Sequence, residues 1–215
     1  MLVKICGITR LEDAEAAVAL GAGAIGFIFW PRSPRAVDPG RARAIAAALP
    51  PFVTTIGVFV NQAPAFVNDV AARVGLGAVQ LHGDERVDVL PQIERPVVKA
   101  FAMGGSEEPD AWPARVRLLI DAHDPDQRGG TGKTVDWGRA AAIAARRPVL
   151  LAGGLNAANV GDAIRTVRPF GIDVSSGVES SPGVKDHARM RALFEAVVEC
   201  PGPDRSGLPP AKGNR

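Results

Sequence analysis

Short apolar runs alternate with longer alanine-rich segments along almost the whole chain, and this alternation constrains the fold more than any other feature. The runs are rich in β-branched residues and too short for helices, which favours buried parallel strands. Eight of them recur, at Leu2–Cys6, Ala24–Phe29, Val53–Val60, Ala78–Leu81, Val97–Phe101, Val116–Asp121, Val149–Ala152 and Ile172–Ser175. Strands that alternate with helices about every 20–30 residues are typical of a barrel. We therefore predict an α/β fold, a single-domain (β/α)8 TIM barrel.

Helical patterns occupy most of the segments between the runs. They cover Leu11–Leu20, Pro39–Leu49, Pro64–Val74, Asp84–Ile93, Trp137–Ala145, Asn156–Val167 and Asp186–Glu199. Thr9-x-x-Glu12 has the form of a capping box for the first helix, and Gly104–Arg115 is the weakest helix because it contains glycines and prolines. An open doubly wound sheet usually has a Gly-rich turn after its first strand. Here that turn is only Cys6-Gly7-Ile8-Thr9, so the barrel is preferred.

The composition argues against several classes of protein. The 215 residues are 47% hydrophobic and 22% charged, and the net charge is +2, as in ordinary globular proteins. With 5% aromatic residues and no tyrosine, the chain does not suggest nucleic-acid binding. No apolar run approaches the length of a membrane span, and no secretion signal is evident. The two cysteines, Cys6 and Cys200, form neither a disulfide framework nor a metal-binding pattern, so we expect a cytoplasmic protein.

The composition changes abruptly near the carboxyl end. Residues 201–215 are dominated by proline, glycine and charge, and no apolar period remains there. We therefore expect a barrel catalytic domain over residues 1–200 and a disordered tail over residues 201–215. The oligomeric state has no clear signature, and both a monomer and a homodimer fit the sequence.

The ends of the last two strands predict a phosphate site. Loops after strands seven and eight commonly bind phosphate in barrels. Gly153-Gly154 allows the backbone to approach an anion, and Asn156 can cap the following helix, whose amino end offers free N–H groups. Ser175, Ser176 and Gly177 add hydroxyl and backbone donors. A tight turn with polar loop residues is the alternative, but two such clusters in these two loops favour phosphate.

Other strand ends carry groups that could take part in chemistry. Cys6 ends the first strand, where a buried structural thiol is the simpler interpretation. Asp121 ends the sixth strand in apolar surroundings, which suit a general acid. Arg35 follows the second strand and could grip a carboxylate. His82 could act as an acid–base group or as a structural histidine.

A lysine inside the first strand needs a partner. Lys4 shares strand parity with Cys6, so both should point to the same side, and if that side is the barrel interior an unpaired charge there is costly. Strands one and eight are neighbours in a closed barrel, and we predict a Lys4–Asp173 pair. Lys99 on the fifth strand raises the same question. Gly129-Gly130-Thr131-Gly132-Lys133-Thr134 only imitates a P-loop, because Gln127 stands where that motif needs glycine. A lid over the site is the better interpretation.

Taken together, the motifs resemble the phosphoribosylanthranilate isomerase family of tryptophan biosynthesis over residues 2–198. The resemblance runs through Val3-Lys4-Ile5-Cys6-Gly7-Ile8-Thr9, Ser33-Pro34-Arg35, Gln80-Leu81-His82-Gly83, Lys99-Ala100-Phe101, Gly129-Gly130-Thr131-Gly132-Lys133-Thr134, Leu151-Ala152-Gly153-Gly154-Leu155 and Asp173-Val174-Ser175-Ser176-Gly177-Val178-Glu179. It implies an Amadori rearrangement of N-(5-phosphoribosyl)anthranilate to 1-(2-carboxyphenylamino)-1-deoxyribulose 5-phosphate. The reaction of this small-molecule substrate would need no metal and no cofactor.

The resemblance also implies roles for individual residues. Cys6 matches the general base and Asp121 the general acid, while Arg35 matches the contact to the anthranilate carboxylate. The expected substrate-binding residues are Arg35, Gly153, Gly154, Asp173, Ser175, Ser176 and Gly177. An isomerase that uses two aspartates is a rival, but position 6 is cysteine. A non-catalytic phospholigand-binding barrel is a second alternative, which would need neither Cys6 nor Asp121.

Overall fold

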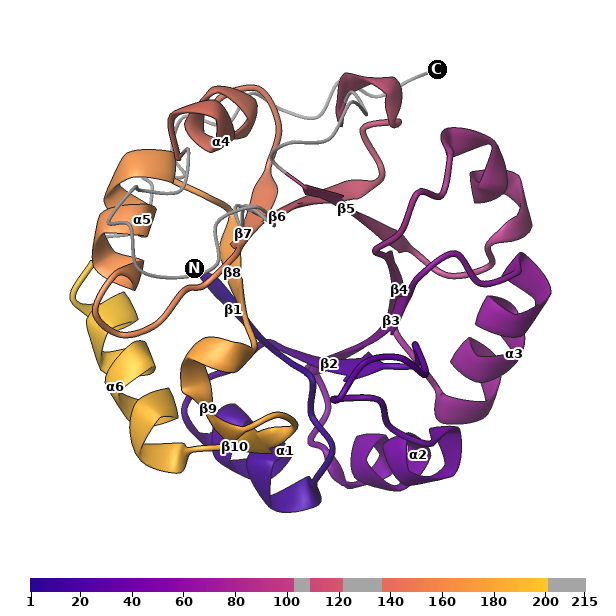
Figure 1. Cartoon of the computed structure of the whole chain (residues 1–215), viewed down its shortest axis with the longest axis horizontal. Helices are drawn as coiled ribbons and strands as arrows, with labels where there is room; N and C mark the ends of the chain where they lie inside the picture. The colour runs from indigo at the N-terminus through magenta and orange to yellow at the C-terminus, as the bar shows by residue number, and fades with distance from the viewer. Residues whose placement is uncertain (103–108, 122–136, 201–215) are drawn as a thin grey trace.

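Eight parallel strands close into a barrel in sequence order, as Figure 1 shows in a view along the barrel. The structure is a computed structural model that describes residues 1–102, 109–121 and 137–200. The strands are β1 (Leu2–Cys6), β2 (Ala24–Ile28), β3 (Thr54–Phe59), β4 (Ala78–Leu81), β5 (Val97–Ala102), β6 (Arg117–Asp121), β7 (Val149–Ala152) and β8 (Gly171–Val174). Pairing of β1 with β8 closes the ring and sets Lys4 opposite Asp173. The predicted (β/α)8 barrel is confirmed, and each strand lies within two residues of its predicted bounds.

Helices surround the barrel (Figure 1). They are α1 (Leu11–Ala19), α2 (Pro39–Ala48), α3 (Pro64–Val74), α4 (Trp137–Ala144), α5 (Val160–Val167) and α6 (His187–Val198). Alternate strand residues such as Ile5 and Phe27 pack outward against helix residues such as Val67 and Leu193 in the main apolar core. The period of two along each strand then leaves the other residues to fill the barrel interior. Within the described ranges, no helix has both the length and the apolar character needed to cross a bilayer.

Two helix predictions are wrong because proline interrupts them. In place of a helix over Asp84–Ile93 there is the short 3-10 helix η1 (Val87–Gln92), which contains Pro91 and so lacks a backbone donor there. The weakest predicted helix, Gly104–Arg115, is reduced in its described part to the 3-10 helix η2 (Pro109–Ala111). The predicted loop at Gly129–Lys133 and the predicted tail at residues 201–215 lie outside the described residues.

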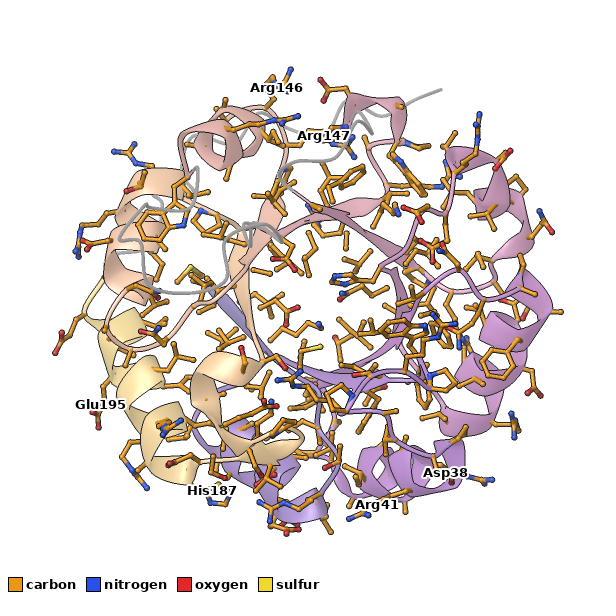
Figure 2. The ribbon with its side chains drawn as sticks, viewed as in Figure 1. Asp38, Arg41, Arg146, Arg147, His187 and Glu195 are labelled. Atoms are coloured by element: carbon orange, nitrogen blue, oxygen red, sulfur yellow. The ribbon has the colours of Figure 1, made fainter. Side chains whose placement is uncertain are left out.

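The segment around η2 is held by an arginine in place of helix packing. Arg147, just after α4, donates hydrogen bonds to four backbone carbonyls, those of Pro109 (2.9 Å), Trp112 (2.7 Å), Pro113 (3.0 Å) and Val116 (3.1 Å). Figure 2 shows Arg147 at the end of α4, beside the η2 segment. A planar guanidinium with five donors is suited to bind several carbonyls at once. This contact fixes the chain that leads into β6 and therefore the position of Asp121.

The predicted capping box at Thr9 and Glu12 does not form. Helix α1 begins after Arg10, and no side chain caps it. The hydroxyl of Thr9 instead donates to the carbonyl of Gly183 at 2.6 Å. Gly183 lies in a hairpin that was not predicted from the sequence, formed by β9 (Glu179–Ser181) and β10 (Val184–Lys185). A tertiary contact therefore replaces the local cap.

A buried aspartate on α1 anchors this hairpin and the start of α6. Asp13 accepts hydrogen bonds from Arg10 (2.7 Å), from the backbone N–H of Lys185 (3.0 Å) and from Nε2 of His187 (2.9 Å). Figure 2 shows His187 at the start of α6. Burial alone would raise the pKa of Asp13, but these donors outweigh it and hold the pKa below its usual value. The ionised carboxylate thus joins α1, the hairpin and α6.

We predict that Asp13→Asn lowers the free energy of unfolding by about 2–3 kcal/mol at neutral pH, because it leaves buried donors facing an amide. The folded-state pKa of Asp13 is depressed, so its contribution is present above about pH 4 and is lost as the pH falls through the folded value. Urea denaturation at several pH values measures both effects. Glu15→Gln, on the exposed face of the same helix, is the control. Equal stabilities of the two variants would contradict this role.

Candidate active site

The carboxyl ends of the strands surround a cavity of about 340 Å³. All of the residues predicted to act or bind at the site line it, namely Cys6, Arg35, Asp121, Gly153, Gly154, Asp173, Ser175, Ser176 and Gly177. Gln80 and His82 of the strand four segment line it as well. In (β/α)8 barrels this end of the strands is where active sites lie. The structure therefore brings the predicted residues together, while their individual roles stay predictions.

A buried polar layer lies one step deeper in the barrel than the catalytic candidates. Because side chains alternate along a strand, Lys4 lies below Cys6 and Gln80 lies below His82. Lys4 Nζ donates to Asp173 Oδ2 at 2.9 Å and to Gln80 Oε1 at 3.0 Å. The predicted Lys4–Asp173 pair is confirmed. Burial alone would lower the pKa of Lys4, but Asp173 and Cys6 outweigh it and raise the pKa, so Lys4 is an ammonium ion.

The thiol of Cys6 is in surroundings that work against its ionisation. It is almost fully buried, and burial raises its pKa. Lys4 and Lys185 favour the thiolate and oppose that shift, whereas Asp173 adds to it. The balance leaves the pKa of Cys6 above its usual value. Gly26 leaves the space that this group needs, since a Cβ atom there would come within 2.8 Å of the sulfur.

Lys185 on β10 ties the ends of β1 and β8 together, a role that the sequence analysis did not identify. Its fully buried Nζ donates to the backbone carbonyls of Cys6 at 2.6 Å and Ser175 at 3.2 Å, and to Glu179 Oε1 at 2.8 Å. Burial lowers the pKa of Lys185, and the Glu179 carboxylate opposes the shift. Lys185 therefore fixes the backbone of two predicted site residues, Cys6 and Ser175.

Arg35 is oriented by the same carboxylate. Its Nε donates to both oxygens of Glu179 at 2.9 and 3.0 Å, and its Nη2 donates to Oε2 at 2.7 Å. Burial alone would raise the pKa of Glu179, but Arg35 and Lys185 outweigh it and lower the pKa. Gly7 allows Arg35 to pack on the loop after β1, since a Cβ atom there would lie 2.8 Å from Arg35 Cδ. The paired guanidinium still lines the cavity.

The two predicted phosphate loops pack against each other at one side of the cavity. Gly153 and Gly154 have φ angles of 98° and 64°, a region that favours glycine. A Cβ atom on Gly177 would lie 1.9 Å from the carbonyl oxygen of Leu155, so only glycine fits there. Asn156 Oδ1 accepts from the backbone N–H of Ala158 at 2.9 Å. Asn156 thus caps a turn, and helix α5 begins four residues later than predicted.

The loop that carries His82 is held by a second buried ion pair. Lys99 Nζ donates to the carbonyl of Gly83 at 2.5 Å and to Glu85 Oε2 at 3.1 Å. The same carboxylate accepts from the backbone N–H groups of Asn61 and Gly83. This arrangement explains the buried lysine on β5. His82 then lies with Nε2 3.8 Å from Asp121 Oδ2.

Known proteins are similar to this chain in sequence and in fold. A model of the N-(5'-phosphoribosyl)anthranilate (PRA) isomerase family matches residues 3–196. The N-(5'-phosphoribosyl)anthranilate isomerase of Geobacter sulfurreducens is 52% identical over 194 residues, covering 89% of this chain and 96% of the relative. The chain belongs to the N-(5'-phosphoribosyl)anthranilate isomerase family. The family expected from the motifs, with its Amadori rearrangement in tryptophan biosynthesis, is thereby confirmed.

Solved structures agree with the family assignment. The phosphoribosyl anthranilate isomerase of Thermotoga maritima superposes with a TM-score of 0.83 at 45% identity, covering 93% of this chain and all of that one. A second phosphoribosyl anthranilate isomerase structure, in complex with reduced 1-(o-carboxyphenylamino)-1-deoxyribulose 5-phosphate, has a TM-score of 0.79 at 43% identity. It covers 93% of this chain and 100% of that chain. In the described part of this family member, no group of three His, Cys, Asp or Glu side chains is placed to hold a metal ion.

We predict that Lys4→Met slows alkylation of Cys6 at a fixed alkaline pH by roughly tenfold or more, because loss of the neighbouring cation raises the thiol pKa further. The measurement uses a Cys200→Ser background, so that Cys6 is the remaining thiol. Lys4→Met/Asp173→Asn removes both charges and serves as the folding control. An unchanged alkylation rate in folded Lys4→Met would show that Lys4 does not favour the thiolate.

Proposed function

We propose that this chain catalyses the isomerisation of N-(5'-phosphoribosyl)anthranilate with Cys6 as general base and Asp121 as general acid. One observation carries the proposal: a thiol and a carboxyl group, on β1 and β6, line one cavity that also has anion-binding groups. Arg35 offers a guanidinium for a carboxylate, and the loops after β7 and β8 offer backbone donors for a phosphate. The substrate carries one anion of each kind.

The reaction proceeds by paired proton transfers. Asp121 donates its proton to the furanose ring oxygen, the C1–O bond breaks, and the anthranilate nitrogen supplies the electrons that form a Schiff base. Cys6, as thiolate, removes the proton from C2, and those electrons flow through C1 to the cationic nitrogen. The resulting enolamine gains a proton at C1 and loses one from the C2 hydroxyl, which gives the ketone. Substrate and product are isomers, so the protons balance.

The cationic intermediate helps to explain how the Cys6 thiol loses its proton. The free protein holds Cys6 mainly as a thiol, because burial raises its pKa. A Schiff base cation that forms beside the sulfur favours the thiolate, since a nearby opposite charge stabilises the charged form. Lys4 adds to this effect from below. The base therefore becomes active when the acid step has taken place.

Asp173 and Ser175 are proposed to contact the sugar part of the substrate. Both line the cavity, and neither Asp173 Oδ1 nor Ser175 Oγ has a hydrogen-bond partner within the described ranges. Buried polar atoms are rarely left unsatisfied in folded proteins. A substrate hydroxyl can donate to the carboxylate oxygen, and a substrate oxygen can accept from the serine hydroxyl. Substrate would thus complete a hydrogen-bonding set that the free protein leaves open.

The remaining proposals concern the whole chain. The family model ends at residue 196 and α6 ends at Val198, which supports a catalytic barrel over residues 1–200 with residues 201–215 outside it. A cytoplasmic location stays a prediction. One solved relative is described as monomers generated from a dimeric phosphoribosylanthranilate isomerase. A monomer and a homodimer both stay open for this chain.

We predict that Cys6→Ala and Asp121→Asn each lower kcat by about 10²–10⁴-fold, the range typical of a lost acid or base. KM should stay within about threefold, because both groups act on protons more than on binding. The assay follows the change in anthranilate fluorescence as substrate is consumed. Cys200→Ala and Asp162→Asn are matched controls away from the cavity. Near-normal rates in both active-site variants would reject the mechanism.

We predict that Arg35→Ala raises KM by about 10–100-fold, which corresponds to one charge-assisted hydrogen-bond contact of roughly 1.5–3 kcal/mol. The effect on kcat should be smaller. Arg32→Ala removes an exposed arginine from the same loop and should leave KM unchanged. Steady-state kinetics of both variants provide the measurement. An unchanged KM in Arg35→Ala would remove its assigned role.

A further inference from the structure

A chain of polar side chains crosses the barrel from the base side of the cavity to the acid side. Lys4 Nζ donates to Gln80 Oε1 at 3.0 Å. Gln80 Nε2 lies 2.7 Å from Nδ1 of His82, and Nε2 of His82 lies 3.8 Å from Asp121 Oδ2. Lys4 and Gln80 are almost completely buried. The chain therefore joins the layer below Cys6 to the opposite wall of the site.

The charge on Lys4 fixes which atom donates and which accepts in each of these hydrogen bonds. An ammonium group has three donors and no acceptor, so the Gln80 atom that faces it must be the carbonyl oxygen. The amide of Gln80 is therefore oriented by chemistry, and its NH2 group must face His82. Because that NH2 group only donates, Nδ1 of His82 must accept. A histidine that accepts at Nδ1 carries its proton at Nε2.

We propose that Gln80 is a positioning residue for the isomerisation. It accepts a hydrogen bond from Lys4 and donates one to Nδ1 of His82, and so holds the Nε2–H of neutral His82 toward Asp121. This proposal rests on the proposed function of Asp121. When Asp121 gives its proton to the ring oxygen, a carboxylate forms in front of this N–H group. The opposite tautomer would place a lone pair against the new negative charge.

The geometry leaves room for this contact to tighten. A hydrogen bond needs about 3 Å between the heavy atoms, so the 3.8 Å gap closes when either side chain turns. Both side chains are partly exposed to the cavity, 35% for His82 and 29% for Asp121. The backbone of His82 is fixed, because its N–H group donates to the carbonyl of Phe59 at 2.8 Å. The place of His82 on the loop is therefore fixed, and only a side-chain movement is needed to bring Nε2 and the Asp121 carboxylate together.

The burial of Gln80 supports a role beyond packing. A buried amide costs free energy unless it is hydrogen-bonded, and a hydrocarbon side chain would fill the space without that cost. Here each end of the amide has a partner, and the two partners are a cation and an imidazole. The buried Gln80 amide thus sets the orientation and the tautomer of His82.

Nuclear magnetic resonance of the full chain tests the tautomer without turnover. The chain has three histidines, and a His82→Gln spectrum assigns the signals of His82 in 15N-labelled protein. We expect wild type at the assay pH to show Nε2 protonated and Nδ1 unprotonated. A proton on Nδ1, alone or together with one on Nε2, would overturn the proposal. This result does not depend on whether Asp121 is the acid.

The variant Gln80→Glu reverses the polarity of the chain, because a carboxylate only accepts. We expect Nδ1 of His82 to become protonated, kcat to fall at least tenfold and KM to stay within about threefold. Gln80→Met removes the donor without imposing the opposite polarity, so its kcat should lie between those of Gln80→Glu and wild type. Gln92→Glu makes the same change at an exposed position and should leave kcat unchanged.

The outcomes separate this inference from the proposed function. Normal kcat in folded Gln80→Glu with a protonated Nδ1 would overturn the positioning role even if Asp121→Asn is inactive. An active Asp121→Asn would reject the acid assignment, whatever the tautomer of His82. If Gln80→Glu fails to fold, as judged by thermal unfolding, the wild-type spectrum and the kcat of Gln80→Met decide the question. A Gln80→Met with wild-type kcat would then count against the proposal.

Discussion

A lysine ammonium buried inside the barrel is the charge on which the rest of the site depends. Burying such an ion is costly unless each of its donors has a partner. Lys4 donates hydrogen bonds to Asp173 and Gln80, and the nearby Cys6 also favours its charged form. Each of these three residues has a different proposed role in the site: Asp173 contacts the sugar, Gln80 orients His82, and Cys6 is the base. Satisfying one buried charge therefore arranges three functional groups at once.

A second ionic centre, outside the ring of strands, arranges the edge of the cavity where substrate binding is proposed. Glu179 pairs with Arg35 and with Lys185, and Lys185 also binds the backbone of Cys6. One carboxylate between two cations leaves a net positive charge, which suits an anionic substrate. The hairpin that carries this centre is held in turn by Asp13 of α1. Lys4 thus positions the proposed catalytic groups, while Glu179 positions Arg35, the proposed contact to the substrate carboxylate.

The structure could be predicted from the sequence where it follows from the two-residue alternation of side chains along a strand. Strand bounds and the Lys4–Asp173 pair could be predicted, because alternation along a strand decides which side chains share the interior. The predicted cap at Thr9 and the helix over Asp84–Ile93 were wrong, since a tertiary hydrogen bond and an internal proline decide those places. The roles of Glu179 and Lys185 were missed because they arise from a short irregular hairpin, which carries no periodic signal.

The inner layer is also consistent with the proposed role of Cys6 as a base that is mainly a thiol in the free protein. Burial raises the pKa of Cys6 while Lys4 opposes that shift, so the free protein holds the group mainly as a thiol. Because the sulfur is largely shielded from water, its interaction with any cation that forms nearby is strengthened. In the proposed mechanism the Schiff base is such a cation, and it forms only after Asp121 has donated its proton. Burial therefore disfavours the thiolate in the free protein but strengthens its attraction to the proposed Schiff base cation, so that the thiolate forms during the reaction.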